Sequence, residues 1–216
     1  MPFLKHLFIR KEAYRPTWKL LVALIVVAPL ILVLTRSLWV RVIAQDLTCV
    51  KDVGKSGAML VENFDPEYIL FQEATKLQRE GIASRVVVPV EISRGMKEPD
   101  AIETGIADLM ARTAGLQGIE QVPVHQVEPI SLNAAREIRD FLKRENISSV
   151  QLIVPGFRSH RSALVYRSVF NPSGIEVKCL PVFVDPPLEW ADSWHGIQDV
   201  VLQWGKLRYY QFWVLL

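Results

Sequence analysis

Between residues 58 and 184 the chain alternates short apolar runs with longer stretches in which apolar residues recur every three or four positions. A short apolar run bounded by turn residues indicates a buried strand, and the longer recurrence indicates an amphipathic helix. The pattern predicts strands over residues 58–61, 85–90, 122–127, 150–154 and 175–184. It predicts helices over about 65–80, 100–114, 131–142 and 159–170, with Asp65 and Ser131 as N-caps of the first and third.

The expected strands are almost entirely apolar, and the fourth and fifth follow the same alternation with helices as the first three. Strands of this kind are covered on both faces, as in parallel sheets sandwiched by helices. We therefore expect residues 58–216 to form an α/β domain. Its predicted core is a Rossmann-like, doubly wound, mainly parallel five-stranded sheet with helices on both faces.

An uncharged apolar run, LLVALIVVAPLILVL, precedes this domain and continues to Trp39. A bilayer core of about 30 Å requires about 20 helical residues, so the run predicts one transmembrane helix over residues 20–39. Residues 1–19 then form an N-terminal segment and residues 40–57 a linker. Two alternatives remain open, a signal peptide cleaved before Gln45 and a buried helix of a soluble domain.

Charge gives the direction of this segment and excludes one class of function. Residues 1–19 are denser in Lys and Arg than the residues after the span, which predicts a cytoplasmic N-terminus and a domain outside the cytoplasm. The whole chain has a net charge of +2, but residues 1–41 carry seven basic residues and one acidic residue. The remaining chain is therefore acidic, which argues against a nucleic-acid partner.

The two cysteines, Cys49 in the linker and Cys179 in the fifth strand, do not have the spacing of a zinc site. A disulfide between them requires an oxidising compartment, and their spacing gives no support for it. Cys179 alone is expected to be a small buried hydrophobe.

Polar residues follow the predicted strands at the edge where ligands of doubly wound sheets bind. The acidic ones are Glu62, Glu91 and Glu128, and the others are Ser131, Asn133, Arg158, His160 and Arg161. Arginines near a helix N-terminus suit an anionic group such as a phosphate. We therefore predict an anion-binding cleft, in which Glu128 is the candidate catalytic base or an orienting group.

Structural explanations compete with each of these assignments. Ser131 can serve as a helix cap and Asn133 can be solvated. The two arginines can form an ion-pair network with Glu128 or Glu91. His160 has no second His or Cys near it, so we expect no metal site.

Several enzyme templates are missing from the sequence. It has no Gly-x-Ser-x-Gly elbow, no Walker A motif, and no glycine-rich turn after the first strand, which ends in Glu62-Asn63-Phe64. Without such a turn a pyrophosphate cannot approach the backbone closely. We therefore expect no nicotinamide or flavin cofactor.

Three motifs in this order resemble those of one family. LQREGIA at residues 77–83 precedes the valine-rich strand, the spacing E-x-x-S-x-N begins at Glu128, and FRSHRSA covers residues 157–163. Residues 58–187 thereby resemble the YdcF-like family (SanA/ElyC-like proteins, domain of unknown function 218), Rossmann-like domains often tethered to the bacterial cytoplasmic membrane. Glu128, Ser131, Asn133 and Arg161 match its motifs residue by residue.

The chain departs from the family pattern at four places, so it resembles a divergent member. Glycines are missing after the first strand, Arg158 stands where the motif has histidine, Ala134 replaces a threonine and Glu137 an asparagine. An arginine in place of a histidine leaves a fixed cation and removes a group that titrates near neutral pH. The change favours anion binding over proton transfer.

The resemblance implies a single-pass protein of the bacterial inner membrane with a periplasmic domain. It implies a role in cell-envelope biogenesis, in peptidoglycan, polysaccharide or lipid-carrier processes. The expected partners are the bilayer, a small anionic and phosphorylated ligand, and envelope proteins. Two alternatives are a phosphate-group hydrolase or transferase and a non-catalytic scaffold. The aromatic stretch 190–216 is expected to be a last helix on the sheet, or a surface for membrane or partner.

Overall fold

The computed structural model describes residues 18–64, 67–93, 95–96, 98–99 and 101–215. The chain divides into two compact units, Met1–Trp39 and Val40–Leu216. The predicted N-cap Asp65 lies outside the described residues. The larger unit contains the sheet and the candidate site.

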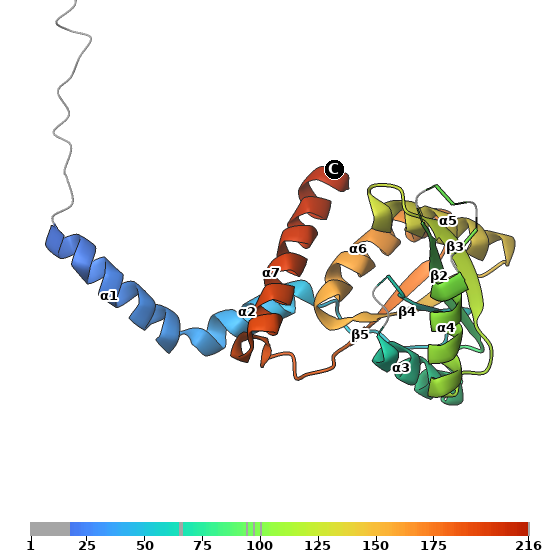
Figure 1. Ribbon diagram of the computed structural model, residues 1–216, viewed down its shortest axis with the longest axis horizontal. Helices are drawn as coiled ribbons and strands as arrows, with labels where there is room; N and C mark the ends of the chain where they lie inside the picture. Colours follow the sequence, from blue (N-terminus) through green and yellow to red (C-terminus); the bar gives the residue numbers. More distant parts are fainter. Residues whose placement is uncertain (1–17, 65–66, 94, 97, 100, 216) are drawn as a thin grey trace, which may run out of the picture. The chain divides into compact units, whose positions relative to one another are not determined.

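The core of the larger unit is a five-stranded sheet in which every pair of neighbouring strands is parallel (Figure 1). The strands are β1 (Ala58–Val61), β2 (Arg85–Ile92), β3 (Glu120–His125), β4 (Ser149–Pro155) and β5 (Glu176–Val182). Their order is β3-β2-β1-β4-β5, which is the doubly wound order of a Rossmann-like sheet. The predicted parallel α/β fold is confirmed, with no strand end shifted by more than two residues.

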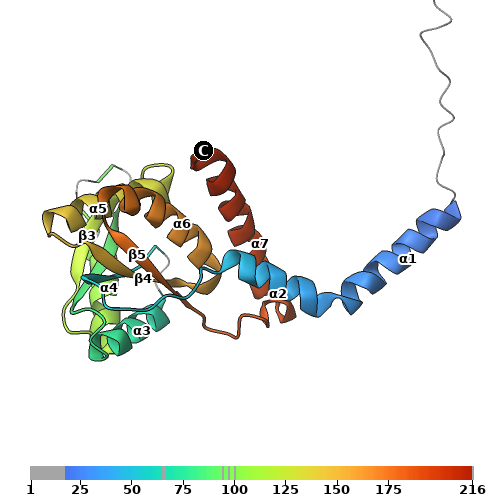
Figure 2. The same cartoon turned by 180° about the vertical axis from the view of Figure 1, so that it is seen from behind.

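Helices cover both faces of this sheet, as Figure 2 shows from behind. The covering helices are α3 (Tyr68–Arg79), α4 (Ala101–Ala114), α5 (Ile130–Arg144) and α6 (Ser159–Phe170). On one face α3 and α4 pack through residues such as Phe71 and Ala107 against Met59 and Val88. On the other face α5 and α6 pack against alternate residues of the same strands. The alternation of side chains along each strand therefore divides the core into two layers.

Helix ends agree with the sequence except at the starts of α3 and α5. Helix α3 begins at Tyr68, with Glu67 as its N-cap, about three residues later than predicted. Gly81 and Gly115 follow α3 and α4 with φ of 73° and 79°, the left-handed conformation that glycine adopts at low cost. Helix α5 starts at Ile130, and its N-cap is Pro129, not Ser131. The Pro129 carbonyl accepts the backbone N–H groups of Leu132 and Asn133. The prediction that Ser131 caps this helix is wrong, because the chain turns two residues earlier.

The N-terminal apolar segment forms α1 (Trp18–Leu34), and α2 (Arg36–Leu47) follows after a break at Thr35. Thr35 donates its hydroxyl to the Ile31 carbonyl (2.7 Å). Among the described residues, no single helix is both long and apolar enough to cross a membrane. One bent pair, Val22–Leu34 with Arg36–Leu47, reaches that length and composition together. The expected helix over residues 20–39 is thus two helices, and residues 40–47 of the expected linker are helical.

The last helix, α7 (Trp194–Tyr209), packs on α6 and on the turn that follows β4. Its buried residues are Val200, Gln203 and Leu207. Tyr210 continues into the core of the α5–α6 layer. The remaining short helices are η2 (Gly156–Arg158), η3 (Asn171–Ser173), η4 (Trp190–Asp192) and η5 (Tyr210–Val214). The helix is therefore packed along one side only.

A disulfide joins Cys49, just after α2, to Cys179 in β5, with an S–S distance of 2.07 Å. Sequence spacing gave no support for this pair. The two residues are 130 positions apart, so only the folded sheet brings them together. The bond ties the start of the larger unit to the edge strand.

The turn after β4 tolerates no side chain at Gly156. A Cβ on this residue would lie 2.1, 2.2 and 2.5 Å from ring atoms of Phe183. We expect Gly156→Ala to lower the free energy of unfolding by about 1–3 kcal/mol, as overpacking does. Urea denaturation measures this, with Gly105→Ala in α4 as the control, because a Cβ there meets no atom within 4 Å. Equal stability of the two variants would contradict the close packing.

Candidate functional site

A pocket of about 310 Å³ lies at the carboxyl ends of the strands. The residues that line it follow β1, lie at the end of β2, follow β4 into the first turn of α6, precede or begin α5, and end α7. Its charged residues are Glu62, Glu91, Glu128, Arg158, Arg161 and Lys206, and its others are Phe64, Ile130, Ser131, Tyr209 and Tyr210. Strand order reverses between β1 and β4, and ligands of doubly wound sheets bind at this reversal.

The floor of the pocket is a buried pair of opposite charges. Arg158 Nη1 lies 3.8 Å from Glu62 Oε2, with the two side chains 10% and 2% exposed. Ser162 donates its hydroxyl to both carboxylate oxygens of Glu62 (2.8 and 3.1 Å). Burial of a charge is unfavourable without such partners. Glu62 therefore fixes Arg158 and the first turn of α6 in place.

Tyr166 of α6 is fully buried close to this pair. Burial raises the pKa of the Tyr166 phenol well above its usual value, and the Glu62 carboxylate raises it further. Within the described residues, its hydroxyl oxygen has no hydrogen-bond partner. The phenol therefore stays neutral, and it borders the ion pair as an uncharged group.

Arg161 lies between α5 and α7, one turn along α6 from Arg158. Its Nη1 donates to Ser131 Oγ (3.3 Å) and its Nη2 to Gln203 Oε1 (3.4 Å). The guanidinium carbon is 5.5 Å from the centroid of the Tyr210 ring, within the range of a cation–π contact. These contacts fix the plane of the guanidinium while leaving it at the pocket wall.

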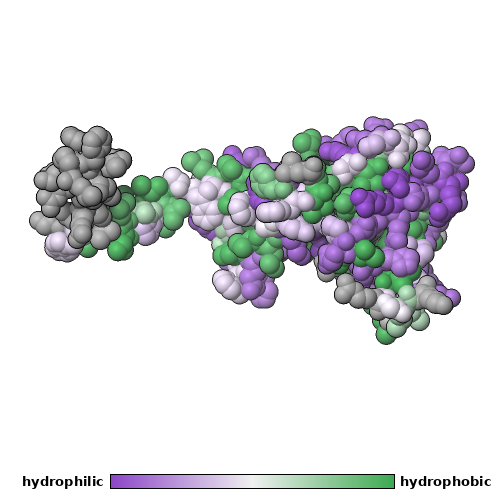
Figure 3. Space-filling view, turned by 90° about the horizontal axis from the view of Figure 1, so that it is seen from above, coloured by the Kyte–Doolittle hydropathy of each residue, from purple (hydrophilic) through white to green (hydrophobic). Residues whose placement is uncertain are grey.

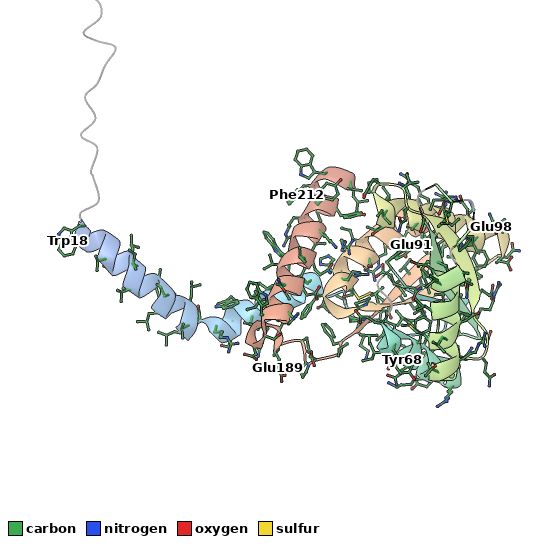
Figure 4. The ribbon with its side chains drawn as sticks, viewed as in Figure 1. Trp18, Tyr68, Glu91, Glu98, Glu189 and Phe212 are labelled. Atoms are coloured by element: carbon green, nitrogen blue, oxygen red, sulfur yellow. A yellow bond between two sulfur atoms is a disulfide. The ribbon has the colours of Figure 1, made fainter. Side chains whose placement is uncertain are left out.

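The rim carries charges that are open to solvent. Glu128 and Lys206 are exposed. Glu91 at the end of β2 accepts a hydrogen bond from the Gln126 amide; Figure 4 labels Glu91 within the domain. The site thus combines a fixed arginine floor with an exposed carboxylate and an exposed ammonium group.

The structure brings together four of the five predicted ligand-binding residues, namely Glu128, Ser131, Arg158 and Arg161. Asn133 is not among the described residues that line the pocket. Its amide donates to the Val127 carbonyl (3.0 Å), and its oxygen accepts from Arg136 (3.1 Å). Asn133 therefore stabilises the turn between β3 and α5. Ser131, expected to cap the helix, instead contacts Arg161.

The C-terminal helix contributes to the pocket, which the sequence did not predict. Lys206, Tyr209 and Tyr210 line the pocket, and Gln203 holds Arg161. No local pattern places this helix beside α6, because it returns to the site through tertiary packing alone. Ser162 could have been predicted as a site residue, since it lies in the same motif as the two arginines.

The residues present do not form a metal centre in the described part of the chain, where no group of three or more His, Cys, Asp or Glu side chains could hold an ion. Comparison with known proteins assigns no family to the chain, because it matches no protein-family model and no curated protein sequence. The chemistry of the pocket itself is therefore the basis for a function.

Proposed function

We propose that this protein is a membrane-anchored domain that binds an anionic, phosphorylated ligand in the pocket at the carboxyl ends of β1, β2 and β4. The observation that carries the proposal is the convergence of Arg158, Arg161 and Lys206 on one pocket. Arginine binds phosphate oxygens through a planar set of N–H donors, and lysine adds a point charge. Fixing these donors before binding reduces the entropy lost on association.

The three pocket carboxylates set the type of anion. Glu62 contacts Ser162 and Arg158 at the floor, whereas Glu128 is exposed at the rim. A ligand with hydroxyl groups next to its phosphate suits this arrangement, since carboxylates accept hydrogen bonds from hydroxyls. A sugar phosphate has both the phosphate and the neighbouring hydroxyl groups. The head group of a polyprenyl phosphate has the phosphate alone.

Anchoring and location are supported by two features. The first is the apolar α1, whose residues appear green in Figure 3, with basic residues before it in the sequence. The second is the Cys49–Cys179 disulfide, since disulfides persist in oxidising compartments and are rare in the cytosol. We place the folded domain on the periplasmic side of a bacterial inner membrane.

The resemblance to the YdcF-like family supports a role in cell-envelope biogenesis. Glu128, Ser131 and Arg161, which match the family motifs, come from three separate segments and line one pocket. Asn133 matches as well but stabilises the neighbouring turn. Three of the four matching residues therefore line the pocket, and the fourth stabilises a turn beside it.

Arg161→Met should weaken ligand binding at least tenfold, because a hydrogen bond to a charged group contributes about 1.5–3 kcal/mol. Lys206→Met, on the exposed rim, should have a smaller effect in the same direction. Isothermal titration calorimetry of the full chain in detergent measures both, with inorganic phosphate, a sugar 1-phosphate and geranyl phosphate as probes.

The control is Lys143→Met, which removes an exposed lysine of α5 outside the pocket. It should bind each probe as the unmodified chain does. Failure of all three probes to bind the unmodified chain, or unchanged affinity in Arg161→Met, would remove the proposal. The ranking of the sugar and prenyl phosphates identifies the ligand class.

A second candidate is hydrolysis or transfer of a phosphate group. The observation in its favour is the exposed Glu128 carboxylate on the same pocket as Arg161, which places a base beside groups that stabilise transferred charge. Glu128→Gln should then abolish turnover of a phosphate ester without changing the melting temperature. Absence of turnover in the unmodified chain over a broad ester panel would leave binding as the function.

A further inference from the structure

The C-terminal helix carries an exposed apolar face opposite its packed side. We define this C-terminal apolar face by its residues: Trp194, Val201, Leu202, Trp204, Phe212 and Trp213. Each is at least 47% exposed. Trp194 and Val201 are seven positions apart, so they share one side of α7, whereas the buried Val200, Gln203 and Leu207 lie on the other side. Phe212 and Trp213 follow in η5.

Such a surface is unusual for a folded domain in water. Single exposed apolar residues are common, but a continuous patch marks an interaction surface. In Figure 4 Phe212 lies near the C-terminal end of α7, and Glu189 lies just before its other end. The face thus runs along the helix.

The composition of the segment favours lipid as the partner. Tryptophan is enriched where a protein meets the membrane–water interface, because its ring is apolar and its N–H is polar. Residues 200–216 contain no Asp or Glu and carry Lys206 and Arg208. A helix with this composition is attracted to anionic lipid headgroups.

Contacts inside the larger unit also tie α7 to the first residues of that unit. Trp190, just before α7, donates its indole N–H to the Val40 carbonyl (3.2 Å). Arg208 near the end of α7 forms an ion pair with Asp46 of α2. Val40 is six positions after Leu34, the end of α1, a reach of about 20 Å when fully extended. If α1 is in a bilayer, the start of the larger unit and the α7 residues that contact it are therefore within that reach of the bilayer surface.

We propose that the C-terminal apolar face lies in the headgroup region of the same bilayer that holds α1. The proposal rests on the proposed membrane anchor and adds a second, independent contact. It differs from a simple tether because it fixes the orientation of the domain. Since α7 also contributes Lys206 and Tyr209 to the pocket, the contact places the pocket next to lipid headgroups.

Nitroxide accessibility tests this proposal on the full chain in nanodiscs that contain anionic lipid. Both native cysteines are disulfide-bonded, so a single introduced cysteine takes the label. The positions are Phe212→Cys and Val201→Cys in the face, with Ile102→Cys in α4 as the control. Ile102 is an exposed apolar residue of similar exposure to Phe212, 68% against 60%.

We expect labels at positions 201 and 212 to collide several-fold more often with oxygen than with a water-soluble nickel complex, and the label at 102 to show the reverse. Labels at 201 and 212 that behave like the label at 102 would overturn the proposal. Labels shielded from both reagents would overturn it too and indicate a protein partner or second copy. A chain that does not enter nanodiscs would refute the anchor itself, which separates the two failures.

Discussion

Removing the Cys49–Cys179 disulfide is expected to lower the free energy of unfolding by about 4–5 kcal/mol. The bond closes a loop with a sequence separation of 130 residues, and the loss of chain entropy on closing a loop grows with its length. The double variant Cys49→Ala, Cys179→Ala should therefore show a large loss of stability in chemical denaturation. A loss of this size is a large share of the total stability of an ordinary domain.

Reduction of the unmodified chain separates the effect of the bond from that of the missing atoms. Cys179 is fully buried, so alanine there also leaves a small cavity. The reduced chain keeps its sulfur atoms and should lose most of the same stability. A change below about 1 kcal/mol on reduction would contradict the loop-closure argument.

Glu62→Gln is expected to lower the free energy of unfolding by about 3 kcal/mol or more. Glutamine keeps the shape and a hydrogen-bond acceptor for Ser162 but removes the negative charge beside Arg158. Both side chains are almost completely buried, and removal of one member of a buried ion pair leaves a charge in a medium of low dielectric constant. Urea denaturation of the purified chain measures the change.

A second substitution distinguishes loss of charge balance from loss of packing. The double variant Glu62→Gln, Arg158→Met should recover part of the stability, because no lone charge then remains buried. Glu176→Gln, at an exposed glutamate of β5, should change stability little. Equal losses in the single and double variants would show that the pair does not balance charge at the pocket floor.

The sheet could be predicted from sequence because each strand carries its own signal. The valine-rich segment of β2 and the apolar run of β4 are buried on both faces, and only a parallel sheet between two helical layers provides this environment. The strand order then places the residues after β1 and β4 at the switch point. Glu128 follows β3 and Arg161 follows β4, and the carboxyl ends of parallel strands lie at one edge of the sheet, so both residues could be assigned to one site from the sequence.

The missed features depend on contacts between residues far apart in the chain. Cys49 meets Cys179, and Gln203 meets Arg161, only after the sheet has formed. The sequence allowed Ser131 to be either a helix N-cap or a pocket residue, and its preference for N-cap positions favoured the first. In the structure its hydroxyl contacts Arg161 instead. The break at Thr35 could not be predicted from the length or the apolar composition of residues 20–39, because both predict one continuous helix.

A crystal structure of the protein soaked in tungstate tests whether the pocket binds phosphate, since tungstate is a tetrahedral oxyanion of strong scattering power that substitutes for phosphate. We expect a peak beside the Arg161 guanidinium, in the pocket bounded by Ser131 and Lys206, and no such peak in crystals of Arg161→Met. Tungstate bound only elsewhere on the molecule, or a peak unchanged in Arg161→Met, would contradict this expectation.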